Sequence, residues 1–575
     1  MAANKITIRA KVAQDALAAD RHNIAPVSGS SGSDNQVELQ WSNKELRLLS
    51  TESGEVWVRD DDFRLAEVRL LTPTLATGNT PPNLLICGDA LHALKSLARL
   101  EQYRRHFSNS IKLCYIDPPF NTGEDFAHYP DSHQTPAWLS LLREHLIRIK
   151  DLLAPDGSVW VHLDDSEQHR ARCVLDEIFG VDAFVATIIW QKRTSRDNRK
   201  AFSAMHDYIH VYAPIGAVAW KKRRNALPDE GAFTNIDGDP RGPWRSVPMT
   251  AQAGHATSGQ FYTVVSPTGA THDPPKGRCW TYTKQRLEEL IADDRVYWPR
   301  AGQGKPRLKH FQSESNGLAP FTVWTAAEVG ENATAKKALM SQFPEISTFD
   351  TPKPLSLLER IVHIATDPGE VVLDCFLGSG TTAVAAQQMG RRWIGIERNV
   401  DTLERFALPR LDAITEGRRI KGKRIVNNEF AVLDVAPSIF VVDSSQCVIL
   451  ADWATGEALA EAIAAQLGYL VDRNGPFIGK SGRTRLAVIE GLADDQVVGK
   501  LAAALGPRQL LDLMATNVDP SALNAVTALG RGHRVRRIPE GILEAYEMRT
   551  GIFEFRGVLE GNANMDRVAR VSGSR

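Results

Sequence analysis

Short apolar segments alternate with amphipathic helical patterns along two long stretches of this chain, and that alternation most restricts its fold. Buried strands are predicted at residues 84–87, 111–116 and 158–163, with helices at 90–100 and 138–153. Strand, helix and strand in succession form the unit of parallel sheets that carry helices on both faces. The sequence therefore predicts an α/β fold with a doubly wound, mostly parallel sheet.

The alternation breaks once and then resumes. Residues 214–342 are irregular and rich in Gly, Pro and Trp, which indicates an insertion with its own shape. Strands at 183–190 and 208–212 precede it, and a helix, strand, helix and strand at 355–365, 370–376, 381–389 and 392–397 follow it. We divide the chain into an N-terminal extension with a Ser/Gly-rich linker (1–80), a first half of the α/β domain (81–213), the insertion (214–342), a second half of the α/β domain (343–425) and a small C-terminal α/β domain of unknown role (426–575).

Composition places few limits on function. The 575 residues include 43% hydrophobic and 24% charged residues and carry a formal net charge of −1, so any surface for nucleic acid must be a local patch. The six cysteines include no CxxC pair, and no segment is long and apolar enough to span a membrane. We expect buried thiols, a cytoplasmic protein and no membrane partner.

The segment Asp117-Pro118-Pro119-Phe120 follows the predicted strand at 111–116 and combines a carboxylate, two residues without N–H groups and an aromatic ring. The prolines must end the strand, which frees the carbonyl of Pro118. Asp117 and that carbonyl can accept the two hydrogens of an amino group on a nucleobase, and Phe120 can stack on the ring. A rigid turn without catalytic function is the alternative.

A second motif joins a buried strand to a helix through two glycines. Gly378 and Gly380 let the backbone approach a ligand closely, and with Ala383 they also satisfy the G-x-G-x-x-A pattern of dinucleotide-binding proteins. Glu397 ends the next strand, where a carboxylate can accept the two hydroxyls of a ribose. NAD and S-adenosylmethionine both fit these residues. The motif is not a P-loop that binds nucleoside triphosphates, because no Lys follows the glycines.

Asp117 to Asp131 (DPPFNTGEDFAHYPD) resembles the motif of amino-group DNA methyltransferases, most closely the modification (Mod) subunits of type III restriction systems. The segment from Phe376 to Gly380 resembles the FxGxG motif of the same family, and catalytic motif, insertion and cofactor motif follow the order of its β class. The resemblance implies a Rossmann-like methyltransferase with S-adenosylmethionine as cofactor and the insertion as target-recognition region. It implies that the cofactor is bound by Asp89, Lys353, Pro354, Asp374, Phe376, Gly378, Gly380 and Glu397. For Asp89, which directly precedes a helix, a helix N-cap is the alternative.

The chemistry implied is methyl transfer to the N6 amino group of an adenine that has been extruded from the duplex. Catalysis falls to Asp117, Pro118, Pro119 and Phe120. Tyr208 or Tyr212 is expected to line the target-base pocket, by resemblance. Phosphate contacts are expected from basic residues after the strand at 183–190 and at the start of the insertion, although a solvated loop is the alternative. These residues are Lys192, Arg193, Arg196, Arg199 and Lys200, followed by 221–224.

Several alternatives stay open at this level. Cytosine-N4 transfer uses the same physics, and only Asp117, where that subgroup usually has Ser, favours adenine. A DNA-recognition subunit without catalysis is the competing class. The implied partners are double-stranded DNA, a restriction or other defence subunit, and a second copy in a homodimer. No metal site is predicted, because His206 and His210 lie about 13 Å apart along a strand.

Overall fold

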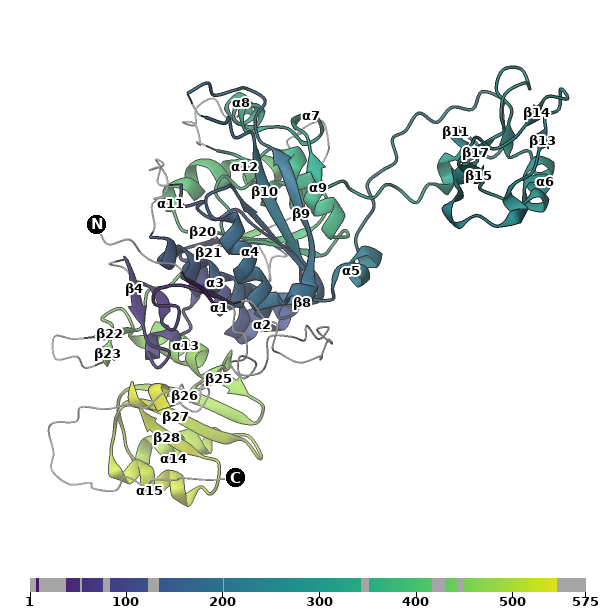
Figure 1. Cartoon of the computed structure of the whole chain (residues 1–575). Coiled ribbons are helices and arrows are strands. Elements are labelled where there is room, and N and C mark those ends of the chain that lie inside the picture. The colour runs from purple at the N-terminus through teal and green to yellow at the C-terminus, as the bar shows by residue number, and fades with distance from the viewer. Residues whose placement is uncertain are drawn as a thin grey trace, which may run out of the picture. The chain divides into compact units, whose positions relative to one another are not determined.

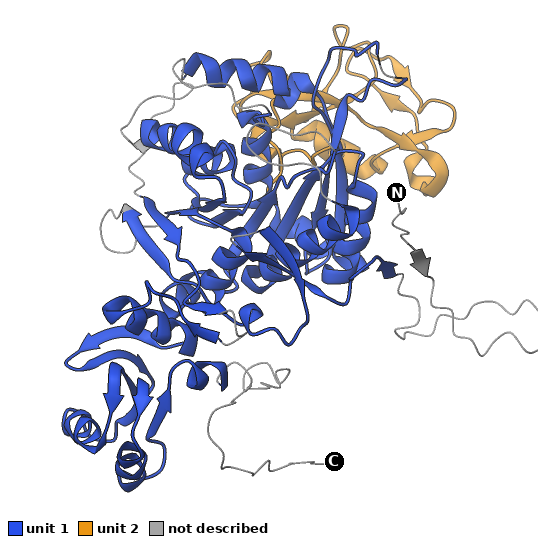
Figure 2. Cartoon of the chain, turned by 90° about the vertical axis from the view of Figure 1, so that its left-hand side faces the viewer, with its two compact units in different colours: residues 1–224, 322–575 blue, residues 225–321 orange. Residues whose placement is uncertain are grey.

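The computed structural model describes residues 7–9, 38–51, 54–75, 83–122, 134–199, 201–342, 351–415, 430–442 and 448–544. The chain forms two compact units, one of residues 1–224 and 322–575 and the other of residues 225–321 (Figure 2). None of the helices in the described ranges is long and apolar enough to cross a membrane. The larger unit carries both predicted motifs.

A ten-stranded sheet forms the centre of the larger unit (Figure 1). In order across the sheet, the strands are β18 (Val323–Trp324), β9 (Phe184–Gln191), β10 (His206–Tyr212), β8 (Leu153–Leu163), β7 (Ile111–Ile116), β19 (Val371–Asp374), β20 (Arg392–Glu397), β6 (Asn83–Cys87), β21 (Phe430–Val435) and β5 (Leu71–Leu75). Neighbouring strands from β8 to β21 are parallel, and β10 and β5 run against their neighbours. The predicted fold class is confirmed.

Helices cover both faces of this sheet. They are α1 (Ala90–Arg99), α2 (Glu101–Phe107), α3 (Thr135–Leu152), α4 (Gln168–Phe179), α5 (Ala217–Arg223), α7 (Ala326–Val329), α8 (Asn332–Gln342), α9 (Leu355–Ala365), α10 (Thr381–Gln388), α11 (Val400–Thr402) and α12 (Leu408–Thr415). α1, α3 and α4 share a core with Cys114 and Ile116 of β7, whereas α9 contacts β7 and packs against α10. Leu113 and Tyr115, which alternate with these two residues, are equally buried. A strand buried on both faces explains why residues 113–116 are continuously apolar.

The strand directions gather the predicted site residues at one edge of the sheet. Asp117 follows β7, the glycine turn follows β19, Glu397 ends β20 and Asp89 follows β6. These strands are parallel, so their carboxyl ends lie at the same edge. Ligands in such sheets bind beyond that edge.

The independent unit inside the insertion is shorter than the predicted insertion of 214–342. Residues 217–224 and 322–342 belong to the larger unit. Arg223 of α5 forms an ion pair with Asp156 at 3.0 Å, and β18 pairs with β9 of the main sheet. These contacts fix both flanks of the insertion, so the separate unit spans residues 225–321.

Two terminal segments also extend the main sheet. β21 pairs with β6, and Phe430 to Leu433 are buried there, although residues 426–575 were predicted to form a separate domain. β5, from the N-terminal extension, pairs with β21. The other strands of the extension are β1 (Thr7–Arg9), β2 (Glu38–Gln40), β3 (Arg47–Thr51) and β4 (Gly54–Val58), which pair as β1 with β2 and β3 with β4.

The C-terminal segment has an α/β sheet of its own. In order across this sheet, the strands are β24 (Leu470–Asn474), β25 (Phe477–Ser481), β26 (Thr484–Ala493), β27 (Leu510–Val518) and β28 (Arg534–Arg537). β26, β27 and β28 are parallel. The helices are α13 (Gly456–Leu467), α14 (Asp495–Ala503) and α15 (Pro520–Ala528), and β22 (Phe440–Val442) and β23 (Val448–Leu450) form a separate pair. We call residues 456–544 the C-terminal domain.

The smaller unit is built from short antiparallel pairs around a small aromatic core. Its elements are β11 (Trp244–Pro248), β12 (Thr250–Gln252), β13 (Val264–Val265), β14 (Thr271–His272), β15 (Arg278–Trp280), α6 (Lys284–Ala292), β16 (Val296–Tyr297) and β17 (Arg307–Phe311). Trp280 and Met249 are buried at its centre. Where the chain enters and leaves the unit, Leu227 and Leu318 exchange backbone hydrogen bonds of 2.9 and 2.8 Å. We call this pair the neck.

Candidate active site

The two predicted motifs share one cavity of about 530 Å³. Asp117 and Pro119 line it from the loop after β7, and Phe376 and Gly378 line it from the turn after β19. The two loops therefore meet in one crevice, as the sequence predicts, although more than two hundred residues separate them. Of the other predicted residues, Asp89, Lys353, Asp374 and Glu397 also line the cavity.

One carboxylate oxygen of Asp117 has a partner, and the other has none. Its Oδ2 forms an ion pair with Nζ of Lys353, while its buried Oδ1 has no hydrogen-bond partner in the described part of the chain. The Lys353 ammonium also lies 5.3 Å from the centre of the Phe120 ring. An unpaired buried carboxylate oxygen is costly, because it loses water without gaining a partner. Asp117 lines the cavity, so a ligand bound there can supply the missing donor.

Contacts on three sides fix the loop that carries Asp117. The Trp138 indole donates to the carbonyl of Pro119 at 2.6 Å, and the Asn121 amide donates to Glu167 at 2.8 Å. Asn121 has φ 61°, a left-handed conformation that Asn tolerates better than most residues. The Phe120 ring packs on His162 at 5.9 Å. No hydrogen bond from the described residues reaches the carbonyl of Pro118, so it stays available as an acceptor.

The glycine turn depends on backbone conformations that favour glycine. Gly378 and Gly380 have φ of 53° and 83°. A Cβ on Gly380 would also meet the Cα of Ala407 at 3.2 Å. The amide of Gly378 donates to Oε2 of Glu397 at 2.8 Å, which joins the turn to the end of β20. Gly380 is the N-cap residue of α10.

Arg410 supports this turn from within the protein, a role that the sequence did not suggest. Its guanidinium is buried and donates to the Ser379 carbonyl and hydroxyl at 2.5 and 3.1 Å and to the Thr381 hydroxyl at 3.0 Å. Burial lowers the pKa of Arg410 to about 10, so it stays charged at neutral pH. No motif marks this arginine, because it lies on α12, about thirty residues after the turn.

The cavity wall is rich in carboxylates. Burial raises the pKa of Asp374 to about 7, and burial also raises the pKa of Glu397. Burial opposes ionisation of Asp89 too, but the nearby His92 and His145 outweigh it and lower the pKa of Asp89. A wall of this kind suits a positively charged ligand, because such a ligand stabilises the charged form of each carboxylate.

Asp89 fulfils the alternative interpretation as well. Its Oδ1 accepts hydrogen bonds from the amides of Leu91 and His92 at 3.0 and 3.2 Å, so it is the N-cap of α1. It nevertheless lines the cavity, so the two interpretations are compatible. Pro354 is the N-cap residue of α9, and its neighbour Lys353 lies on the cavity wall.

The N-terminal extension contributes a part of the wall that sequence reasoning missed. Ser50 and Glu55, from the hairpin of β3 and β4, both line the cavity. Arg47 anchors this hairpin to α3 through a pair of hydrogen bonds to Glu144. The only local signal was a pair of strand-like segments, and nothing in them indicated a ligand.

The prediction that Tyr212 lines a target-base pocket is wrong. Its ring is buried against Phe184 at 5.6 Å, and its hydroxyl donates to Asp176 of α4 at 2.6 Å. Tyr212 therefore belongs to the core between β10 and α4. Tyr208 is partly buried, and its hydroxyl lies 3.0 Å from Nε2 of His206.

The predicted phosphate contacts differ in their surroundings. Lys192 forms an ion pair with buried Asp207 at 2.7 Å, and Arg199 pairs with Asp197 at 2.8 Å on the surface. Arg193 donates to the carbonyl of Ser195 at 3.1 Å, and Arg196 is exposed. Lys200 lies outside the described residues. Within the basic run 221–224, Arg223 fastens α5 to the main domain and is not free for DNA.

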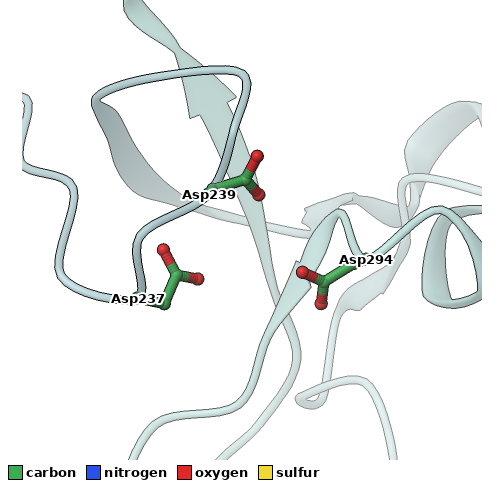
Figure 3. Close-up of side chains that lie close together, drawn as sticks. All are labelled: Asp237, Asp239 and Asp294. Carbon is green, nitrogen blue, oxygen red and sulfur yellow. The ribbon is translucent and has the colours of Figure 1, made fainter.

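Three aspartates of the smaller unit lie close enough to suggest a metal site (Figure 3). Asp237 and Asp239 come from one loop and Asp294 from another, but the ammonium of Lys309 lies 2.7, 3.1 and 2.9 Å from their carboxylates. Lys309 therefore already supplies a positive charge to all three carboxylates, and Arg241 also pairs with Asp239 at 2.8 Å. The group therefore forms a buried-lysine ion network of the smaller unit.

A family model described as DNA methylase (N6_N4_Mtase) matches residues 111–407. This match begins with β7, includes both motifs and covers more than half of the chain. The chain belongs to this DNA methylase family. Membership agrees with a cavity formed jointly by Asp117 and the glycine turn.

Several curated relatives of this chain are named as methyltransferases or Mod subunits. The Mod subunit of the type III restriction-modification enzyme StyLTI from Salmonella typhimurium is 30% identical over 347 residues, which cover 55% of this chain and 51% of the relative. The type II methyltransferase M.EcaI from Enterobacter cloacae is 29% identical over 313 residues, with 52% and 65% coverage. The chain thus spans about half the length of the type III relative. Among solved structures, PvuII DNA methyltransferase (cytosine-N4-specific) is 13% identical, with a TM-score of 0.32 and coverage of 58% and 90%.

Proposed function

We propose that the protein is a site-specific DNA methyltransferase that transfers the methyl group of S-adenosylmethionine to N6 of an extruded adenine. The observation that carries this proposal is that Asp117 lines a cavity together with the glycine turn and that its buried Oδ1 is unpaired. An acceptor at that position can take a hydrogen bond from an exocyclic amine. Family membership supports the same class of chemistry.

The residues of the cavity fit S-adenosylmethionine. The volume of about 530 Å³ lies in the usual range for pockets that bind small molecules. The sulfonium and ammonium groups of the cofactor are cationic, and Asp374 lies on the wall with its pKa raised to about 7 by burial. Glu397 lines the cavity and would accept the ribose hydroxyls, and the turn at Gly378 would allow close approach. The bound cofactor supplies the electrophilic methyl group.

The protein side of the reaction consists of positioning. Asp117 Oδ1 and the Pro118 carbonyl accept the two N–H bonds of the amine, which localises the nitrogen lone pair, while Phe120 offers a stacking surface. Lys353 keeps the carboxylate oriented through Oδ2. In the transfer, a nitrogen–carbon bond forms, the carbon–sulfur bond breaks and the sulfur keeps the electron pair. The methylated amine then releases its surplus proton to solvent.

Incubation with duplex DNA and methyl-labelled S-adenosylmethionine, followed by digestion to nucleosides, tests the proposal. We expect the label on N6-methyladenine. Label on N4-methylcytosine would instead identify cytosine as the target base. This second candidate is favoured by a family whose model covers both N6 and N4 methylation. No label on either base, for a protein that binds DNA and cofactor, would contradict the proposed activity.

We further propose that the chain acts as the modification subunit of a restriction-modification system and is a homodimer. Names of relatives support the first part, since the StyLTI and EcoPI relatives are Mod subunits of type III enzymes. The smaller unit and the loop with Arg193 and Arg196 would contact the target DNA. Light scattering of the purified protein tests the dimer, and co-purification from its host tests for a restriction subunit.

A further inference from the structure

The C-terminal domain carries three exposed arginines at one edge of its sheet. Arg483 precedes β26, Arg508 precedes β27 and Arg531 precedes β28. These strands are parallel neighbours, so the three preceding loops lie side by side. Two hydrogen bonds join these loops to the adjacent strand, from Leu510 N to the Arg483 carbonyl at 3.0 Å and from Leu511 N to His533 Nδ1 at 3.1 Å. We call Arg483, Arg508 and Arg531 the arginine row.

The arginine row lacks neighbouring negative charge. The loops at 482–483, 504–509 and 529–533 contain no Asp or Glu. The nearest buried carboxylate, Asp512, is already paired with Arg536 at 2.8 Å and Arg534 at 3.5 Å. Within the described part of the domain, no hydrogen bond or ion pair joins the three guanidinium groups of the row to another side chain.

Two helix-capping aspartates of this domain lie at the opposite edge. Asp494 caps α14 and Asp519 caps α15, both after the carboxyl ends of strands. Helix dipoles account for these aspartates, because negative charge is favourable at a helix N-terminus. The same effect favours cations at helix C-termini, and Arg508 and Arg531 follow the ends of α14 and α15, whereas Arg483 follows a strand. The helix dipole therefore does not account for Arg483, and the row as a set needs another explanation.

We infer that the arginine row is a second DNA-binding surface, which holds the phosphate backbone of double-stranded DNA outside the methylated site. Neighbouring strands lie about 4.8 Å apart, so the row extends over roughly 10 Å. Each DNA strand advances about 3.4 Å per phosphate, so the row extends over about three phosphate steps. Guanidinium groups are well suited to such contacts. This inference rests on the proposed function, since it requires a protein that acts on DNA.

Two double variants with equal loss of charge test the surface. Arg483→Gln/Arg531→Gln removes two members of the row. Arg473→Gln/Arg537→Gln removes two arginines at the opposite edge, which are 58% and 57% exposed. Fluorescence anisotropy with duplex DNA of unrelated sequence, over a series of salt concentrations, gives the affinity and its salt dependence. Cofactor affinity and circular dichroism serve as controls for folding.

We expect the row variant to lower the slope of log affinity against log salt by about 2 and to weaken binding roughly 50-fold at about 0.1 M salt. The control variant should change the affinity less than about twofold, because exposed charges at a distance are screened. Equal effects of both variants, or no effect of either, would overturn the inference while leaving methyl transfer by the wild type intact. A wild type that binds no DNA would overturn both this inference and the proposed function. Adding Arg508→Asn, which suits the φ of 63° at that position, should lower the slope by about one more.

Discussion

Only one of the two carboxylate oxygens of Asp117 has a hydrogen-bond partner in the described residues, and the other remains as an acceptor for a substrate amine. Lys353 fixes Oδ2, and the aromatic ring of Phe120 lies beside the same ammonium. The unpaired Oδ1 has no protein partner to give up before it accepts an amine, and preorganised groups of this kind stabilise developing charge most effectively. The acceptor is therefore ready before substrate arrives.

Asp117→Ala should lower kcat for methyl transfer by roughly 10² to 10³, because one preorganised partner of the amine is lost. Affinity for S-adenosylmethionine should change little, since Asp374, Glu397 and the glycine turn stay in place. Single-turnover transfer and calorimetric titration of the cofactor measure the two quantities. Retention of wild-type kcat would exclude the proposed role of Asp117.

Asp374 should make cofactor binding depend on pH. Burial raises its pKa to about 7, so the empty site holds a proton below that pH. A cationic ligand binds the ionised form, so affinity should rise with pH through about 7 and then level off, with up to about tenfold change per pH unit below it. Calorimetric titrations across this range measure the effect, and Asp374→Asn should bind weakly with a flat profile. If the cofactor affinity of Asp374→Asn still depended on pH, the titrating group would be a different residue.

The raised pKa of Asp374 also affects the stability of the cofactor-free protein, which should fall with rising pH where cofactor affinity rises. The native state keeps a proton on Asp374 that the unfolded chain releases from its ordinary value of 3.8 upward. Native protein thus binds more protons than unfolded protein across this window, and the contribution of Asp374 to stability falls as pH rises toward 7. Bound cofactor should offset this loss.

Arg410 connects the residue scale to the element scale, because α12 supports the turn between β19 and α10 through this side chain. Arg410→Met keeps the bulk but leaves buried acceptors unpaired, which should reduce the free energy of unfolding by roughly 1–3 kcal/mol. We also expect weaker cofactor binding and an unchanged kcat at saturating cofactor. Denaturant titration and steady-state kinetics measure these effects. An unaltered KM for the cofactor would show that the turn holds its shape without this support.

Elements with strong local patterns could be predicted from the sequence nearly to the residue. The strands at 111–116 and 392–397 and the helix at 355–365 coincide with β7, β20 and α9. The two strands are short apolar runs buried on both faces, and the helix has a periodic apolar face. Residues directly beside the two motifs were found for the same reason. The local sequence around the ends of buried strands determines both these elements and the motif residues that follow them.

Features that depend on distant partners could not be predicted. β5 and β21 pair across more than 350 residues, and Ser50 and Glu55 reach the cavity only because a hairpin packs on α3. Tyr212 was misplaced because the face of β10 that its ring occupies depends on α4, which no local pattern shows. Arg410 was missed because a buried arginine has no periodic or motif signature.

At the scale of the whole molecule, the neck makes the smaller unit separable. Leu227 and Leu318 are paired neighbours, so a short Gly-Ser segment in place of residues 229–316 can join the two chain ends. We expect this variant to fold and bind S-adenosylmethionine but to lose sequence-specific DNA binding. Calorimetry and binding to methylatable and unrelated duplexes test both outcomes. Loss of cofactor binding would show that the larger unit depends on the smaller one.

The neck also has an evolutionary consequence. A module whose entry and exit are adjacent can be replaced by a recombination event with two breakpoints, while the parts that hold the methyl donor are inherited unchanged. If the smaller unit recognises the target as proposed, descendants of one ancestral gene could then acquire new DNA target sequences by exchanging this unit. A protein engineer could change the specificity by the same route.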